Sequence, residues 1–97
     1  MYSLSNAAVQ DIEEILEQSL AEFGMLQTEN YSNSLTRCLK LLGEHPEMGR
    51  TAEEIRPGYR RLPHKSHLIF YKPTGKNGIL VIRILHHHMD AIRHIQD

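Results

Sequence analysis

The sequence predicts an α+β fold in which an N-terminal strand and a two-helix hairpin precede a three-stranded antiparallel meander, with both helices on one face of the sheet. Two observations predict it. Apolar residues between positions 6 and 44 recur every three or four residues, as in amphipathic helices. Residues 59–86 instead are rich in β-branched and aromatic side chains and are interrupted by turn residues. We expect the 97 residues to form one domain, spanning 1–97.

Residues 1–44 predict a strand and two helices. Met1 to Leu4 is a short strand candidate, and Ser5 offers its hydroxyl as the N-cap of the first helix, which ends at Gly24. The second helix is expected at 26–44. It stops before His45-Pro46 because proline disfavours helix in the residue before it. The apolar stripe of the first helix comprises Ala8, Ile12, Ile15, Leu16, Ser19 and Phe23. Acidic residues occupy many of the other positions, namely Asp11, Glu13, Glu14, Glu17 and Glu22.

Residues 48–57 predict a crossing loop, and strands are expected at 59–64, 66–72 and 79–86. Asn77-Gly78 suits a tight turn before the last strand. Residues 90–95 suit either a short helix or a frayed tail. Short connections make the three strands antiparallel neighbours.

The last strand predicts which face of the sheet meets the helices. Strict alternation groups Leu80, Ile82 and Ile84 on one face and Ile79, Val81, Arg83 and Leu85 on the other. Burying an unpaired guanidinium is costly, so we expect the Arg83 face to lie away from the helices. That face is then open to solvent or to a partner.

Charge is divided unevenly along the chain. Residues 1–55 contain ten Asp or Glu and three Lys or Arg. Residues 56–97 contain two Asp or Glu and eight Lys or Arg, together with six of the seven His. This division predicts a cationic surface on one layer and an acidic layer elsewhere. A hydrophobic content of 40% without an apolar run of membrane-spanning length indicates a soluble protein. The single cysteine, Cys38, fits a reducing cytoplasm and a role in the core.

Two motifs carry candidate chemistry. Arg56, Arg60 and Arg61 surround a Pro-Gly bend at a spacing able to grip phosphates or carboxylates, although pairing of one arginine with the acidic first helix is an alternative. The run His86-His87-His88 resembles a metal motif, but in a strand His87 points opposite to its neighbours and no familiar ligand spacing completes it. We therefore expect no metal and no cofactor, and treat the imidazoles as part of the basic surface.

Several strings resemble the ParE toxins of bacterial toxin–antitoxin modules, within the wider ParE/RelE superfamily. They include Tyr2-Ser3-Leu4-Ser5, Asp11-Ile12, Phe23-Gly24, Met48-Gly49-Arg50, Gly58-Tyr59-Arg60-Arg61, His67 to Tyr71 and, most specifically, Arg83-Ile84-Leu85-His86 followed by Met89-Asp90. The resemblance implies the fold given above. It also implies a small cytoplasmic toxin that inhibits DNA gyrase and is neutralised by a cognate ParD-like antitoxin in a hetero-oligomer. Neither membrane association nor direct nucleic-acid binding is expected.

The resemblance also suggests which residues meet each partner. Target engagement is expected at Arg56, Arg60, Arg61, Arg83, His86, His87 and His88. Antitoxin binding is expected at exposed apolar residues of the helical hairpin and at two arginines, namely Leu20, Met25, Leu26, Leu41, Arg60 and Arg83.

Two alternatives remain open. RelE members of the superfamily cut mRNA on the ribosome, which requires a base, cations and an acid around the scissile phosphate. Here Arg61, Arg83 and His86 would fill those roles, but no tyrosine follows Tyr71 and the lysine-rich cluster of RelE is missing. These departures favour a gyrase inhibitor that is not an enzyme, although His88 stands where ParE-like sequences often have Arg. The other alternative is a degenerate, non-toxic module that still binds antitoxin.

Overall fold

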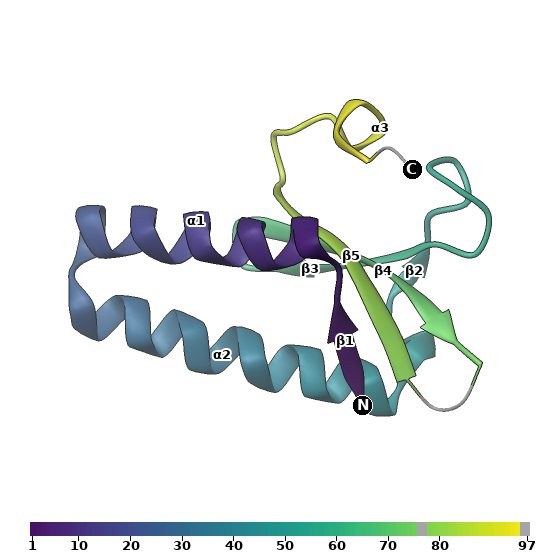
Figure 1. The fold of residues 1–97 in the computed structure, drawn as a ribbon, viewed down its shortest axis with the longest axis horizontal. Coiled ribbons are helices and arrows are strands. Elements are labelled where there is room, and N and C mark those ends of the chain that lie inside the picture. The colour runs from purple at the N-terminus through teal and green to yellow at the C-terminus, as the bar shows by residue number, and fades with distance from the viewer. Residues whose placement is uncertain (76–77, 96–97) are drawn as a thin grey trace.

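The computed structural model describes residues 1–75 and 78–95 and confirms the predicted α+β order (Figure 1). One predicted feature needs adjustment, because the expected loop at 48–57 contains a short strand and begins at the last residue of a 3-10 turn. Of the two alternatives for residues 90–95, the structure has the short helix. The elements are β1 (Tyr2–Leu4), α1 (Asn6–Phe23), α2 (Met25–Glu44), η1 (Pro46–Met48), β2 (Arg50–Thr51), β3 (Arg60–His64), β4 (His67–Thr74), β5 (Gly78–His86) and α3 (Ala91–His94).

The sheet has the strand order β1-β5-β4-β3-β2. β1 runs parallel to β5, while the other neighbours are antiparallel and form the predicted meander. β2 adds an edge strand through Arg50 opposite Arg61 and Thr51 opposite Arg60. Two residues are too few to produce a strand pattern, which is why the sequence did not predict β2. The tight turn expected at Asn77-Gly78 lies partly outside the described residues, and Gly78 begins β5.

Local signals set the helix ends. The Ser5 hydroxyl accepts a hydrogen bond from the Ala8 amide at 3.0 Å, as predicted for an N-cap. Gly24 separates α1 from α2 with φ of 86°, a conformation that suits glycine. α2 continues to Glu44 and stops before Pro46. The two helices run side by side, and their connection projects beyond the end of the sheet (Figure 1).

Both faces of the sheet are covered. The helices bury one face in a first cluster that includes Leu35, Leu42, Ile69, Tyr71 and Val81. The opposite face carries a second cluster made by the 52–59 loop and the C-terminal segment, comprising Ala52, Tyr59, Phe70, Leu85 and Ile95. The expectation that this second face is open is therefore wrong. Segments without regular periodicity supply its cover, so alternation in the strands did not predict it.

A β-bulge in β5 explains how the faces are assigned. Phe70 pairs with Arg83 while Tyr71 pairs with Val81, so Ile82 is an additional residue on β5. Ile79 and Val81 therefore share the helix side with Ile84, which strict alternation did not predict. Beyond the bulge, Arg83 lies opposite Phe70 on the side of the second cluster, as expected. Its guanidinium nevertheless reaches Asp11 on α1, so Arg83 is not remote from the helices.

Candidate functional site

Arg83 is bound to the first helix. Its Nε and Nη2 donate to the two carboxylate oxygens of Asp11 at 2.8 and 2.9 Å, and its Nη1 donates to the His94 carbonyl at 2.7 Å. The hydrogen bonds that Arg83 donates to Asp11 raise the pKa of Arg83, against the opposing effect of burial. The guanidinium predicted to meet a partner thus holds α1, β5 and the C-terminal segment together.

Asp11 was expected at a solvent-facing position, and that expectation is wrong. Only 7% of Asp11 is exposed, and its Oδ2 also accepts the Ile84 amide at 2.9 Å. β1 pairs with β5 only as far as Val81. Beyond that point the Asp11 carboxylate accepts the hydrogen bond of a β5 amide that a neighbouring strand would otherwise accept. Its spacing does carry a signal, because Asp11 lies three residues after Ala8 and four before Ile15, on the apolar stripe.

The structure does not bring the predicted arginines into one group. Arg60 lies opposite Tyr71, and its Nη1 donates to the Gly49 carbonyl at 2.6 Å. Arg61 lies opposite Phe70 on the other face, with its Nη1 at 3.3 Å from Glu54 Oε2. Its acidic partner therefore comes from the 52–59 loop and not from α1.

Arg61 and Arg83 share one row of the sheet. Each lies opposite Phe70, which is fully buried between them. Two strand spacings separate their backbones by roughly 10 Å. Arg56 lies away from this row, in the 52–59 loop, where it is half-buried.

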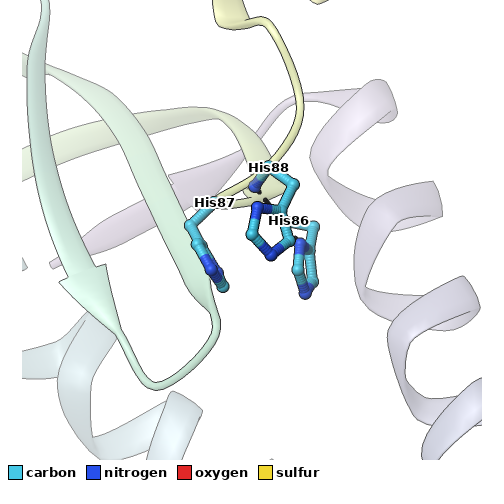
Figure 2. Close-up of side chains that lie close together, drawn as sticks. All are labelled: His86, His87 and His88. Atoms are coloured by element: carbon cyan, nitrogen blue, oxygen red, sulfur yellow. Dashed lines mark hydrogen bonds between the residues drawn. The ribbon is translucent and has the colours of Figure 1, made fainter.

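The three consecutive histidines do gather at one place (Figure 2). β5 ends at His86, and His87 and His88 form the following turn, so strand alternation does not separate their side chains. The ring centroids lie 4.5 Å apart for His86 and His87, 3.9 Å for His87 and His88, and 4.9 Å for His86 and His88. The expectation that His87 points away from the other two is wrong.

This ring cluster continues to the second helix. The His67 ring lies 5.5 Å from that of His86, and Tyr31 lies 5.9 Å from His67 and 5.5 Å from His64. The Tyr31 hydroxyl and His67 Nδ1 form a hydrogen bond of 3.0 Å.

Burial, with a smaller effect of Cys38, raises the pKa of Tyr31 to about 12, so its hydroxyl stays protonated at neutral pH. Burial lowers the pKa values of His64 and His67, and neighbouring cationic groups lower them further.

A cleft of about 710 Å³ opens beside this cluster. It lies between the C-terminal end of α1, the N-terminal end of α2 and the turn from β3 to β4. Its lining includes Phe23, Leu26, Tyr31, Lys65, His67 and His86. Aromatic and aliphatic side chains next to imidazoles and Lys65 suit an amphipathic segment with acidic residues.

The tip of the helical hairpin exposes apolar residues next to the cleft. The tip residues, with their exposed fractions, are Leu20 (49%), Phe23 (57%), Met25 (71%) and Leu26 (74%). Phe23 was predicted in the core stripe, and that prediction is wrong because the hairpin extends beyond the sheet that would cover it. Leu41, expected in the same group, is 45% exposed but follows Leu26 on α2 by fifteen residues, roughly 22 Å along the helix.

Within residues 1–75 and 78–95, no helix is both long enough and apolar enough to cross a membrane.

Comparisons with known proteins agree with this fold. Residues 2–91 match the family described as the ParE toxin of type II toxin–antitoxin systems, parDE. The chain is 40% identical over 94 residues to Toxin ParE1 of Mycobacterium tuberculosis, covering 97% of this chain and 96% of the relative. It is 35% identical over 94 residues, with the same coverage, to Toxin ParE1 of Caulobacter vibrioides.

A solved structure described as the chromosomal ParDE TA system from P. aeruginosa has the same fold. Its TM-score is 0.74 at 18% sequence identity, covering 88% of this chain and 92% of that one. The sequence match from position 2 to position 91, the relatives and the shared topology agree, so this chain belongs to the ParE toxin family.

Proposed function

We propose that this protein is the toxin of a type II toxin–antitoxin module, that it inhibits DNA gyrase in the cytoplasm without being an enzyme, and that a ParD-like antitoxin neutralises it in a hetero-oligomer. The match of residues 2–91 to the ParE toxins carries this proposal. Relatives named Toxin ParE1 align along nearly their whole length.

The geometry supports inhibition over RNA cleavage. A nuclease of the RelE type would need Arg61, Arg83 and His86 within reach of one phosphate. Arg83 instead directs its Nε, Nη1 and Nη2 at Asp11 and at the His94 carbonyl. The buried ring of Phe70 lies between the backbones of Arg61 and Arg83.

Two assays on the purified protein test the target. We expect inhibition of gyrase supercoiling with trapped cleaved DNA, and no codon-dependent mRNA cleavage on translating ribosomes. Cleavage on ribosomes without gyrase inhibition would establish the RelE-type alternative. Antitoxin binding with neither activity would establish the degenerate module.

Arg61 offers a specific test of target engagement, because its side chain is 35% exposed and replacing it leaves the Asp11–Arg83 pair intact. We expect Arg61→Gln to weaken gyrase inhibition by roughly two- to fivefold, since an exposed charged contact contributes about 0.4–1 kcal/mol. Arg37→Gln, on an exposed position of α2, is the matched control and should inhibit like the parent. Equal inhibition by both variants would remove Arg61 from the target-binding set.

The hairpin tip and the adjoining cleft support an antitoxin site. An amphipathic segment can bury apolar side chains against the tip residues and place acidic groups near Lys65. We expect Leu26→Asp to weaken antitoxin binding by more than about tenfold. Val9→Asp is the control, because Val9 is 39% exposed on α1 and does not line the cleft. Unchanged affinity in Leu26→Asp would place the antitoxin elsewhere.

A further inference from the structure

The end of β5 brings three imidazoles within reach of a single ion. One ring nitrogen from each of His86, His87 and His88 lies within 4.8 Å of the other two (Figure 2). His87 and His88 are exposed and His86 is half-buried, so an ion has direct access from solvent. The same three residues are expected to engage the target, and His86 lines the cleft, so ion binding would be a further property of this surface.

Hydrogen bonding indicates which nitrogen offers a lone pair in two of the rings. His87 Nδ1 lies 2.9 Å from the Ser66 carbonyl, which only accepts, so Nδ1 carries the proton and Nε2 presents a lone pair. A carbonyl that orients a histidine in this way is typical of the second layer of metal sites. His86 Nδ1 accepts the His88 amide at 3.3 Å, a long bond that a metal ion at the same lone pair would replace.

We propose that His86, His87 and His88 form a binding site for a divalent transition-metal ion, with Zn²⁺ as the reference ion. Imidazole ligands favour zinc, nickel and copper over magnesium or calcium. Zinc–nitrogen bonds of about 2.0–2.1 Å require ligand nitrogens roughly 3.3 Å apart in a tetrahedral site, so the three rings must rotate inward. His87 and His88 lie in an exposed turn, where such rotation meets little packing. Water completes the coordination, and His67 is the nearest further imidazole, with its ring centroid 5.5 Å from that of His86.

Calorimetric titration of Zn²⁺ into untagged protein at neutral pH tests the site. We expect one ion per chain and an apparent affinity in the micromolar range, and we expect Mg²⁺ not to bind. His86→Gln, His87→Gln and His88→Gln should each weaken zinc binding by roughly tenfold or more. His45→Gln is the matched control, because His45 is an exposed histidine at the end of α2, outside the cluster. Equal affinities in the parent and the three cluster variants would overturn the proposal.

Imidazole NMR on the unmodified chain decides the question independently of the variants. Adding Zn²⁺ should shift the ring nitrogens of His86, His87 and His88 together, while the His45 and His94 signals stay in place. No shift in the three rings at millimolar Zn²⁺, or equal shifts at every histidine, would show that the cluster holds no specific ion.

Discussion

Asp11 connects three parts of the molecule through one carboxylate. It lies on α1, accepts the Ile84 amide of β5, and binds Arg83, whose Nη1 reaches the His94 carbonyl. Its side chain is 8% exposed and that of Arg83 is 23% exposed, so the pair is shielded from solvent on most sides. The loss of one partner would leave the other charge uncompensated in this setting.

We expect Asp11→Ala to lower the free energy of unfolding by about 3 kcal/mol, because Arg83 and the Ile84 amide both lose their acceptor. Urea unfolding measures this loss. Glu13→Ala is the control, since Glu13 is exposed on the same helix, and should stay within about 0.5 kcal/mol of the parent. Equal unfolding midpoints for the two variants would show that the pair contributes no net stability.

His67 makes stability depend on pH. Burial first, and then neighbouring imidazoles, lower its pKa below the ordinary value of 6.5. Near and below pH 6.5 the folded state therefore binds fewer protons than the unfolded state. The contribution that neutral His67 makes to stability is complete above pH 6.5 and is lost as the pH falls through the lowered pKa. The groups that face His67 are His64, His86, His87, the Asp11 carboxylate, whose charge opposes the lowering, and the Tyr31 hydroxyl from α2.

We expect the melting temperature to fall between about pH 7.5 and about pH 5.5, and the fall to be smaller in His67→Gln. Thermal unfolding across this range measures both slopes. His45→Gln should keep the parent slope, because His45 is exposed and lies outside the ring cluster. A His67→Gln slope equal to that of the parent would assign the pH dependence to other groups.

At the level of elements, the sequence predicted the parts that follow local rules. Ser5 caps α1, Gly24 ends it, and Pro46 limits α2, since each acts through its own backbone or side chain. The bulge at Ile82 and the strand β2 were missed because they depend on pairing with distant segments. The cover of the second face was missed for the same reason, since the 52–59 loop and α3 show no periodicity.

The C-terminal segment contributes one buried side chain to that cover. Ile95, which follows α3, is 5% exposed and packs with Phe70 and Leu85, whereas Ile92 within α3 is 63% exposed. We expect Ile95→Ala to cost about 2–4 kcal/mol in the free energy of unfolding. Ile92→Ala, the matched control, should change it by less than about 0.5 kcal/mol. If both variants unfold at the parent midpoint, the C-terminal segment does not seal the second cluster.

At the scale of the whole molecule, three arginines from the basic half, Arg60, Arg61 and Arg83, do not form one group. Arg60 and Arg61 lie on opposite faces, and Arg83 is paired with Asp11. Sequence position predicted that cations gather in residues 56–97, but their separation follows from strand register and from acidic partners distant in sequence. The exposed tip residues Leu20, Met25 and Leu26 were predictable because they lie off the apolar stripe of their helices.

The distribution of charge bears on how an acidic antitoxin would approach. Lys65 lies on the cleft beside the imidazoles, while Lys40 lies near the C-terminal end of α2, next to Met1 and Tyr2. Electrostatic steering acts over a Debye length, so raising salt from about 0.05 M to about 0.5 M should slow antitoxin association several-fold or more. Stopped-flow mixing measures this rate.

Lys65→Gln should slow association at low salt and reduce its salt dependence, whereas Lys40→Gln should not, because only Lys65 lies on the cleft. An association rate indifferent to ionic strength would mean that apolar contact at the hairpin tip alone governs the encounter.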